Sequence, residues 1–290
     1  MPFKILRKHK LEDSGTLYEM DINATLIARK AFAGHFIILR VNERGERIPL
    51  TIADYDRDKG FITIVFQVVG KSTLLLSHQK TNDEILDIVG PLGNEIRVEK
   101  YEFPVVIIGG GVGIAECYPQ AKELKKVGNE IISIIGARTK DFLFWKDKMA
   151  AVSNRLIICT NDGSEGIKGF VTKPLQDLLK NEEISVVITI GPLIMMKNIS
   201  SLTDGSTGLP KVKTYVSLNT IMIDGTGLCG GCRFFTHNGE IRFACVDGPT
   251  VDGHIIDFNN LINRANRFSD QEKKSFEKFK NECKNLGGAK

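Results

Sequence analysis

Residues 105–113 read Val105-Val106-Ile107-Ile108-Gly109-Gly110-Gly111-Val112-Gly113, an apolar run that ends in a glycine-rich loop. A short continuous run of β-branched residues predicts a strand that is buried on both faces. Residues 114–127 then have the pattern of a helix, and Gly128 predicts its end. Backbone N–H groups at the start of such a helix suit a pyrophosphate, because glycines let it approach closely.

The glycine loop departs from the usual dinucleotide-binding pattern at one position. Gly111 and Gly113 fit the G-x-G-x-x-G spacing, but Glu116 occupies the place of the third glycine. Taken alone, the loop is also compatible with an ordinary tight turn between a strand and a helix. The strand before it and the helix after it favour nucleotide binding by Gly110, Gly111, Val112 and Gly113.

Three more apolar runs follow, at residues 130–136, 155–160 and 185–191. Strands of this kind that alternate with helices predict a parallel sheet with both faces covered. Ligands of such sheets lie beyond the carboxyl ends of the strands. Further nucleotide-binding candidates therefore come from the strand ends, and they are Arg138, Asp162, Gly163, Gly191 and Pro192.

The end of the second of these strands bears on the choice between NAD and NADP. It reads Gly136-Ala137-Arg138-Thr139-Lys140-Asp141, and the adenosine ribose is expected there. Arg138 and Lys140 suit a 2′-phosphate, whereas Asp141 suits a 2′-hydroxyl. The residues alone leave both cofactors open.

The first hundred residues have a different pattern, with short apolar or alternating runs between turn residues. Such runs predict strands of a small antiparallel barrel, and they lie at residues 17–22, 36–41, 60–69 and 84–93. The chain is thus expected to be of the β plus α/β class. We expect a barrel domain at 1–100, an α/β domain at 101–220, a metal-binding loop at 221–257 and a charged helical tail at 258–290, with a disordered end.

The metal-binding loop is predicted from the run Asp224-Gly225-Thr226-Gly227-Leu228-Cys229-Gly230-Gly231-Cys232, together with Cys245. The plant-type [2Fe–2S] spacing is Cys-x4-Cys-x2-Cys…Cys, and the run fits it when Asp224 replaces the first cysteine. The glycines allow positive φ angles and bring N–H groups close to sulfur. We therefore expect Asp224, Cys229, Cys232 and Cys245 to hold a [2Fe–2S] cluster.

A zinc site is the alternative for the same residues. Three cysteines and one further donor also suit zinc, and Asp224 would then be an ordinary turn residue. An oxygen ligand on iron is harder than a thiolate, so the reduction potential should differ from that of an all-cysteine cluster. Cys117, Cys159 and Cys283 lie far from this run and are expected to be ordinary thiols.

Composition limits the class of protein. The 290 residues are 42% hydrophobic and 26% charged, which is ordinary for a globular protein of more than one domain. The net charge of +4 is small and its basic residues are scattered, so no nucleic acid partner is expected. No apolar run reaches the roughly 20 residues of a membrane span, and residues 1–8 lack the core of a signal peptide. We expect a cytoplasmic protein without a membrane partner.

Two further motifs carry a resemblance to a known family. Arg47-Ile48-Pro49-Leu50-Thr51, followed by Gly70-Lys71-Ser72-Thr73, resembles the flavin-binding pair of the ferredoxin–NADP reductase superfamily. With the glycine loop and the cysteine run, residues 1 to about 255 are similar to one branch of it. That branch contains the electron-transfer subunit of dihydroorotate dehydrogenase and the small subunit of the NADH-dependent reduced ferredoxin:NADP oxidoreductase.

The resemblance implies that the barrel binds FAD. Thr51 would lie near flavin N5, and Arg47 would meet the pyrophosphate. The full set of implied FAD-binding residues is Arg47, Pro49, Leu50, Thr51, Val65, Phe66, Gln67, Gly70, Lys71, Ser72 and Thr73. It also implies NAD(H) at the glycine loop, with NADP possible. No catalytic residue is assigned, since hydride transfer between nicotinamide and flavin needs little acid–base chemistry.

Asp224 distinguishes members within this branch. The dihydroorotate subunits have cysteine as the first cluster ligand, whereas the small subunits of the bifurcating enzyme have aspartate, as here. The resemblance therefore implies electron transfer from NAD(H) through FAD and the cluster to a larger partner with FAD and [4Fe–4S] clusters, and indirectly to ferredoxin. The alternatives are the electron-transfer subunit of dihydroorotate dehydrogenase and a zinc-stabilised nucleotide-binding module without turnover.

Overall fold

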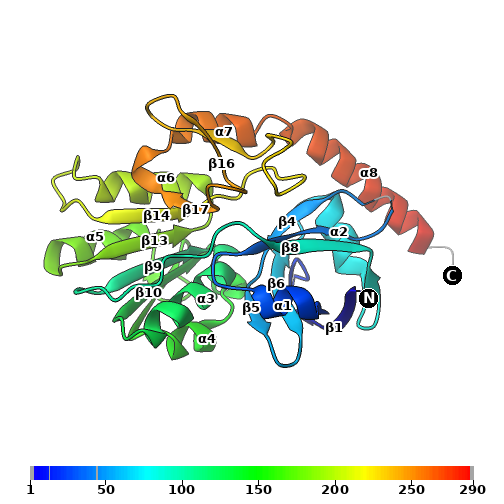
Figure 1. Cartoon of the computed structure of the whole chain (residues 1–290), viewed down its shortest axis with the longest axis horizontal. Coiled ribbons are helices and arrows are strands. Elements are labelled where there is room, and N and C mark those ends of the chain that lie inside the picture. Colours follow the sequence, from blue (N-terminus) through cyan, green and yellow to red (C-terminus); the bar gives the residue numbers. More distant parts are fainter. Residues whose placement is uncertain (1–2, 13, 44, 288–290) are drawn as a thin grey trace.

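The computed structural model describes residues 3–12, 14–43 and 45–287, which form two halves and a segment that packs across both (Figure 1). The N-terminal half consists of two antiparallel sheets, with strand orders β5-β6-β2-β1-β7 and β4-β3-β8. Its elements are β1 (Phe3–Lys10), β2 (Leu17–Asn23), α1 (Thr25–Lys30), β3 (Phe36–Arg40), β4 (Ile48–Thr51), β5 (Asp54–Asp56), β6 (Phe61–Gln67), α2 (Lys71–His78), β7 (Glu84–Ile85) and β8 (Asp87–Leu92).

The two antiparallel sheets enclose one apolar core, as expected for the predicted barrel. Alternation along β6 separates two environments. Ile64 and Phe66 belong to the barrel core, whereas Val65 belongs to the core of the other half of the molecule. The barrel thus presents one face of β6 to its neighbour.

The C-terminal half is built on a seven-stranded sheet of order β12-β11-β10-β9-β13-β14-β17. Its strands are β9 (Val105–Gly110), β10 (Ile131–Ala137), β11 (Arg155–Thr160), β12 (Ile167–Lys168), β13 (Val186–Ile190), β14 (Lys213–Ser217) and β17 (Thr250–Asp252). Its helices are α3 (Gly113–Lys126), the 3₁₀ turn η1 (Lys140–Phe142), α4 (Lys146–Ala151), α5 (Thr172–Asn181) and α6 (Leu193–Thr203).

Helices cover both faces of this sheet, which explains the continuous apolar runs. In β9, Val105 and Ile107 pack in the same core as residues of α3 and α4. Val106 and Ile108 face the opposite way, into the core formed with α5 and α6. All pairings in this sheet are parallel except that of β14 with β17. The predicted parallel sheet is therefore confirmed, apart from one antiparallel edge strand.

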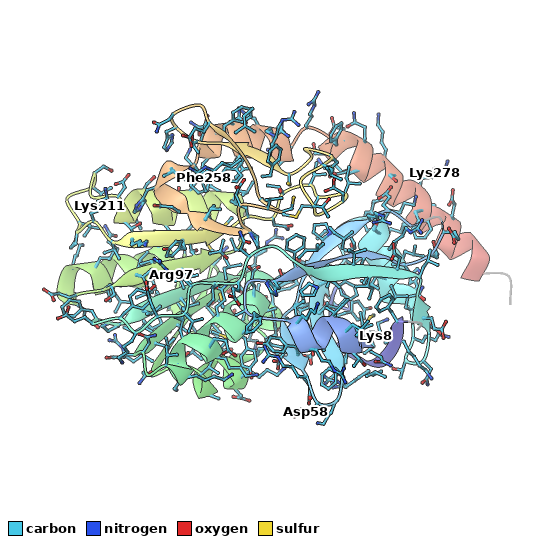
Figure 2. All side chains as sticks on the ribbon, viewed as in Figure 1. Lys8, Asp58, Arg97, Lys211, Phe258 and Lys278 are labelled. Carbon is cyan, nitrogen blue, oxygen red and sulfur yellow. The ribbon has the colours of Figure 1, made fainter. Side chains whose placement is uncertain are left out.

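The segment after β14 was expected to be a loop, and it holds more regular structure than that. It contains the hairpin β15 (Arg233–Phe235) and β16 (Ile241–Phe243), then β17 and the 3₁₀ turn η2 (Gly253–Ile255). The predicted helical tail is confirmed as α7 (Phe258–Ala265) and α8 (Ser269–Gly287). Helix α8 extends along the barrel half with Lys278 exposed (Figure 2). The disordered end was expected at residues 287–290, but Gly287 is the last residue of α8, and 288–290 lie outside the described residues.

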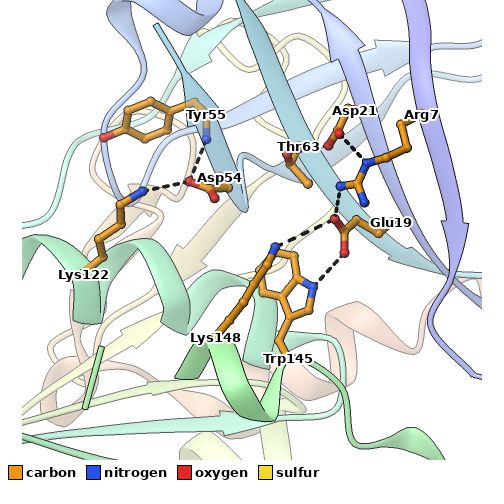
Figure 3. A network of polar contacts seen from close by, with 9 residues as sticks. All are labelled: Arg7, Glu19, Asp21, Asp54, Tyr55, Thr63, Lys122, Trp145 and Lys148. Atoms are coloured by element: carbon orange, nitrogen blue, oxygen red, sulfur yellow. Dashed lines mark hydrogen bonds and ion pairs between the residues drawn. The ribbon is translucent and has the colours of Figure 1, made fainter. Parts of the chain in front are cut away.

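Polar contacts join the two halves (Figure 3). Glu19 of β2 accepts hydrogen bonds from the Arg7 guanidinium and, at 2.8 Å, from the Trp145 indole at the start of α4. Lys148 of α4 also pairs with Glu19, at 3.8 Å. Lys122 of α3 reaches Asp54 of β5 at 3.2 Å. These contacts fix the barrel against α3 and α4. No described helix is long and apolar enough to cross a membrane.

Candidate functional site

A cavity of about 660 Å³ lies between the barrel and the carboxyl ends of the sheet strands, a usual size for a ligand pocket. Three parts of the chain line it: strands β4 and β6 of the barrel, the strand ends of the α/β half, and the segment after β14. Most of its lining is apolar, with a few polar groups at its walls. Its position agrees with the rule for ligands of open α/β sheets.

The barrel wall of the cavity contains five of the eleven expected flavin-binding residues. These are Pro49, Leu50, Thr51, Val65 and Gln67. Phe66 is different, since its side chain is buried in the barrel core and stacks on Tyr18, with ring centroids 5.6 Å apart. Alternation along β6 accounts for this, because Phe66 points to the face opposite Val65 and Gln67.

The other expected flavin-binding residues lie outside the cavity lining. Arg47 forms an ion pair with Asp87 of β8, at 3.0 Å. Ser72, in the first turn of α2, donates a hydrogen bond to Glu46 at 3.0 Å, so the loop before β4 and the start of α2 are linked.

Gly70, Lys71, Ser72 and Thr73 form the N-terminal end of α2. The Thr73 hydroxyl accepts hydrogen bonds from the N–H groups of Val69 and Gly70, both at 3.1 Å. A methyl group added at Gly70 would meet nothing within 4 Å, so the space beside this helix start is open. Open space at a helix N-terminus is suited to a phosphate.

The nucleotide wall of the cavity contains seven of the nine expected residues: Gly110, Gly111, Val112, Gly113, Arg138, Gly191 and Pro192. Gly111 has φ +55° with open space beside it, and at Gly113 a Cβ would lie 2.3 Å from the carbonyl oxygen of Ile190. Glycine is therefore required at Gly113 by close packing of α3 on β13, and it leaves room for a ligand at Gly111.

Asp162 and Gly163 lie just outside this wall. The Asp162 carboxylate accepts hydrogen bonds from the hydroxyl and the N–H of Ser164, which lower its pKa. Asn161, one residue earlier, lines the cavity instead. The strand end was correctly located from the sequence, but the side chain that faces the cavity is its neighbour.

Other lining residues were missed in the sequence. They are Leu17, Phe36, Ala53, Ala115, Glu116, Gly136, Ala137, Phe142, Asn161, Gly169, Phe170, Val171, Thr172, Ile190, Ile194, Met195, Asn198, Ser217, Leu218, Asn219, Met222 and Pro249. Ser217 is the last residue of β14, and Leu218 and Asn219 follow it; the lysine and threonine residues of this strand interrupt the apolar pattern. Glu116 could have been noticed in the sequence as a lining residue, because it occupies the place of the third glycine in the G-x-G-x-x-G pattern.

Glu116 is nearly buried in the first turn of α3. One carboxylate oxygen accepts a hydrogen bond from Thr51 of β4 at 3.1 Å, and the other accepts one from Ser217 of β14. Burial raises the pKa of Glu116, and the two hydrogen bonds oppose that rise. The carboxyl group therefore connects the flavin wall, the nucleotide wall and the end of β14.

Residues 221–257, which we call the cysteine segment, bring two of their three thiols together. Cys232 and Cys245 are buried, and their Sγ atoms are 3.1 Å apart, well beyond the roughly 2.05 Å of a disulfide bond. Burial raises the pKa of the Cys245 thiol to about 12. Cys229 is exposed, and its Sγ accepts a hydrogen bond from the N–H of Gly231 at 3.4 Å.

Asp224 lies in the same loop and contacts Cys229. Its carboxylate accepts hydrogen bonds from the N–H of Thr226 at 2.9 Å and of Cys229 at 2.6 Å, and the first of these leads in lowering its pKa. Among the described residues, no three potential metal-binding side chains converge at ligand distance. The four expected ligands thus share one segment, and the thiols of Cys232 and Cys245 are adjacent.

The chemistry of this segment fits an iron–sulfur cluster. Three free thiols and one carboxylate form the donor set, and Gly225, Gly227 and Gly230 all have positive φ angles. Leu92 and Ile38 pack against Gly225, so the loop is seated on the barrel. Glycine at these positions leaves backbone N–H groups free to approach sulfur.

The cysteine segment also borders the cavity. Met222 and Pro249 belong to its lining. Phe36 of β3 lines the cavity as well, and it packs in the same apolar core as Cys232 and Cys245. Cys117 and Cys159 are free and buried far from this segment in the sequence, as expected for packed thiols. The side chain of Cys283 lies outside the described part of the chain.

Comparisons with known proteins agree with this site. The model of the iron–sulfur cluster binding domain of dihydroorotate dehydrogenase B matches residues 219–257. A Thermotoga maritima homolog of the dihydroorotate dehydrogenase B (NAD(+)) electron transfer subunit is 44% identical over 276 residues and covers 95% of each chain. The Bacillus pumilus subunit of that enzyme is 31% identical over 247 residues, which are 83% of this chain and 92% of that one.

Solved structures extend the comparison to the whole fold. A chain of the NADH-dependent reduced ferredoxin-NADP oxidoreductase, a structure concerned with flavin-based electron bifurcation, has a TM-score of 0.88 at 42% identity. It covers 96% of this chain and 98% of that one. The ferredoxin reductase of carbazole 1,9a-dioxygenase, at 16% identity and a TM-score of 0.59, covers 70% of this chain and 64% of that one and shows a likeness of fold alone.

These matches confirm the expected fold and the expected class of oxidoreductase subunit, and they agree with the expected cofactor set of FAD, NAD(H) and a [2Fe–2S] cluster. The 44% identity extends over nearly the full length of both chains, so the likeness is not confined to one motif. The chain belongs to the family of dihydroorotate dehydrogenase B electron transfer subunits and their homologues, within the ferredoxin reductase fold.

Proposed function

We propose that this chain passes electrons between NAD(H), FAD and a [2Fe–2S] cluster, and on to a larger iron–sulfur flavoprotein in a bifurcating ferredoxin:NADP transhydrogenase. One observation carries the proposal. A single cavity is lined by the expected flavin-binding strands, by the glycine loop and by the cysteine segment. The two nucleotides would therefore share one cavity, with the cluster in the segment that borders it, as sequential transfer requires.

The lining of the cavity supports a set of residues that would hold the two nucleotides. Thr51 and Gln67 offer polar groups to an isoalloxazine ring between β4 and β6, and the open start of α2 suits the FAD phosphates. Gly111 and the start of α3 suit the pyrophosphate of NAD(H). FAD supplies acceptance of a hydride and release of single electrons, and the apolar lining keeps water from the reacting rings.

NAD(H) is the proposed dinucleotide, although Arg138 leaves room for NADP. Arg138 lines the cavity at the end of β10, where the adenosine ribose is expected. Asp141 lies in η1 close behind it and suits a 2′-hydroxyl.

The cluster would be held by Asp224, Cys229, Cys232 and Cys245. The Asp224 carboxylate retains free lone pairs after accepting two N–H bonds, so hydrogen bonding and iron ligation are compatible. Electrons would leave through the exposed side of the loop, where Cys229 lies.

A larger partner subunit would dock on this loop. Five large apolar side chains of the segment are exposed: Leu228 is 90% exposed, Ile241 54%, Ile223 52%, Val246 48% and Ile221 42%. Exposed apolar patches of this kind mark interaction sites. A partner that covers them would bring its first redox centre next to the cluster.

The alternative is the electron-transfer subunit of dihydroorotate dehydrogenase. It is favoured by the family model over residues 219–257 and by the Bacillus relatives. Both functions share the same flow of electrons through this chain, so the partner distinguishes them. Isolation of the native complex is expected to yield a large subunit with FAD and [4Fe–4S] clusters, whereas a subunit that oxidises dihydroorotate would support the alternative.

The protein purified without oxygen tests the proposal for this chain. We expect flavin, iron and acid-labile sulfide in the ratio 1:2:2, bleaching of the flavin by NADH, and a paramagnetic signal from the reduced cluster. A colourless protein that contains zinc instead would support the zinc-stabilised module and contradict the proposal.

Replacement of Asp224 tests its role as an iron ligand. Asp224→Cys is expected to retain a [2Fe–2S] cluster with a shifted reduction potential and altered visible spectrum, because a thiolate replaces a harder oxygen ligand. Asp224→Asn is the matched control, since asparagine preserves a turn acceptor but is a poor ligand. Potentiometric titration and iron analysis measure both. If Asp224→Asn has the iron content and potential of the wild type, Asp224 does not bind iron.

A further inference from the structure

Glu116 is a buried, ionisable group of the cavity that the proposed function leaves without a role. It lies on α3, and its two carboxylate oxygens accept hydrogen bonds from hydroxyl groups on two different walls. Thr51 comes from β4 of the barrel, and Ser217 comes from the end of β14. A carboxyl group with both oxygens so engaged has a fixed position at the junction of the two halves.

The surroundings of Glu116 contain no compensating charge. It is 9% exposed and takes part in none of the ion pairs found among the described residues. Besides Glu116, the ionisable side chain among the cavity-lining residues is Arg138, on β10's far end. The adjacent Cys117 thiol is buried and has a raised pKa, and β4 and β14 contribute only hydroxyls. A carboxylate in this position is costly, and its protonated form is favoured by burial.

We propose that Glu116 is a positioning residue that takes up a proton when the flavin is reduced and relays this change through the Thr51 hydroxyl. The inference rests on the proposed function, because it needs FAD beside Thr51. The carboxyl group would change its protonation with the redox state of the flavin, and it occupies the place of the third glycine in the G-x-G-x-x-G pattern.

Charge balance supplies the reason. A hydride carries two electrons and one proton from NADH, which becomes NAD⁺, so the flavin gains one unit of negative charge. The negative charge of the reduced flavin, close to the Glu116 carboxylate in a cavity of low polarity, disfavours the charged form of Glu116. A proton from solvent would then bind a Glu116 carboxylate oxygen. Loss of two single electrons from the flavin to the cluster would release this proton, together with the proton that the flavin received in the hydride.

The hydrogen bonds explain how Thr51 would respond. A carboxylate accepts the hydroxyl protons of both Thr51 and Ser217. A protonated carboxyl group has an O–H of its own to donate, so one of the two hydroxyls must turn and become the acceptor. Rotation of the Thr51 hydroxyl would free its proton to point into the cavity, toward the reduced ring.

The flavin potential of the purified holoprotein tests this inference. Glu116 has one pKa when the flavin is oxidised and a higher pKa when it is reduced. Between these two pH values, reduction takes up an extra proton, so the flavin reduction potential of the wild type is expected to fall more steeply with pH there, in what we call the steep segment. Glu116→Gln is expected to lose that segment, because glutamine binds no proton. Glu123→Gln is the matched control: Glu123 lies on the same helix, pairs with Lys126 and does not line the cavity. It is expected to retain the steep segment.

Ser217→Ala provides a second test that does not depend on the Glu116 variant. Loss of the Ser217 hydroxyl removes a hydrogen bond that stabilises the carboxylate, so the steep segment should move to higher pH. The infrared difference spectrum between oxidised and reduced protein should contain a band of a protonated carboxyl group in the wild type and in Glu123→Gln.

The outcomes separate the two proposals. Absence of FAD from the wild type would contradict the proposed function itself. Bound FAD that NADH reduces, with identical potential curves for the wild type and Glu116→Gln and no carboxyl band, would overturn the role of Glu116 alone. An unmoved steep segment in Ser217→Ala would also count against it.

Discussion

Glu12 is the carboxylate whose hydrogen bonds are most numerous in the barrel half. It is nearly buried between β1 and β2 and accepts bonds from the N–H groups of Ser14, Thr16 and Leu17 and from the Thr16 hydroxyl. Burial alone would disfavour its charge, but these donors outweigh burial and lower its pKa to about 2. The carboxylate thus replaces backbone partners in a loop that connects two core strands.

Glu12→Gln is expected to lower the free energy of unfolding by roughly 2 kcal/mol at neutral pH, as for hydrogen bonds to a charged group. A lowered pKa means that this stabilisation is complete above the ordinary value of 4.5 and is lost as the pH falls toward about 2. Urea denaturation at several pH values measures it. The exposed Glu43→Gln variant should match the wild type throughout, and a constant deficit of Glu12→Gln across that range would contradict the assignment.

At the scale of single residues, backbone requirements were predictable and side-chain partners were not. Gly111 and Gly113 could be placed because their roles depend on local geometry after a strand. The contact of Glu116 with Ser217 joins positions 101 residues apart, and no local pattern specifies such a pair. The sequence shows that Glu116 is unusual, and only the fold shows what it contacts.

Among the elements, α4 has a special role because its first residues contact the barrel. Trp145 precedes the helix with a positive φ of 55°, and its indole N–H donates to the buried Glu19 at 2.8 Å. The Lys148 ammonium lies 3.8 Å from the centre of the same ring. The start of α4 therefore connects the two halves by the hydrogen bond to Glu19, and the cation–π contact holds the indole against Lys148 within α4.

Trp145→Phe is expected to lower the free energy of unfolding by about 1–2 kcal/mol, because a buried carboxylate loses one donor and the ring attracts Lys148 less. Circular dichroism in urea is the suitable measurement, since Trp145 is the only tryptophan. Glu182→Gln is a control, as its ion pair with Arg155 is partly exposed and should matter little. Equal stability of Trp145→Phe and the wild type would show that this connection is not needed.

Elements with continuous apolar runs could be predicted, whereas those with mixed composition could not. The strands β9, β10, β11 and β13 were all found, because burial on both faces leaves only apolar residues. Strands β1 and β14 were missed, since their charged and hydroxyl residues resemble loop sequence. The edge strand β17 could not be predicted, because only its pairing with β14 makes it a strand.

For the molecule as a whole, the exposed apolar side chains of the cysteine segment are the docking surface that we propose for a partner. Leu228 is 90% exposed and lies next to Cys229 in the sequence. The charged helix α8 runs from the same region along the barrel (Figure 1). A large apolar side chain in full contact with water is costly unless a second protein covers it.

Leu228→Asp is expected to weaken recovery of the native partner subunit by tenfold or more, since a charge would be buried at the centre of the contact. Reduction of this chain's own flavin by NADH should be unchanged. Leu26→Asp is the control: Leu26 is 78% exposed on α1 of the barrel, away from the cysteine segment. Affinity purification with quantified partner yield measures both, and equal yields for the two variants would place the docking surface elsewhere.

The cysteine segment also has a structural role, because its strand β17 pairs with β14 and is the last strand of the seven-stranded sheet. Deletion of residues 221–257 would remove β17 from the edge of the sheet. The N–H and C=O groups of β14 would then be unpaired and could pair with strands of other molecules. The shortened chain would be prone to aggregate before it could act as a simple flavin reductase. The cluster-binding residues therefore cannot be lost by deletion of the whole segment. A natural variant without the cluster would have to lose its ligands and still retain the surrounding chain.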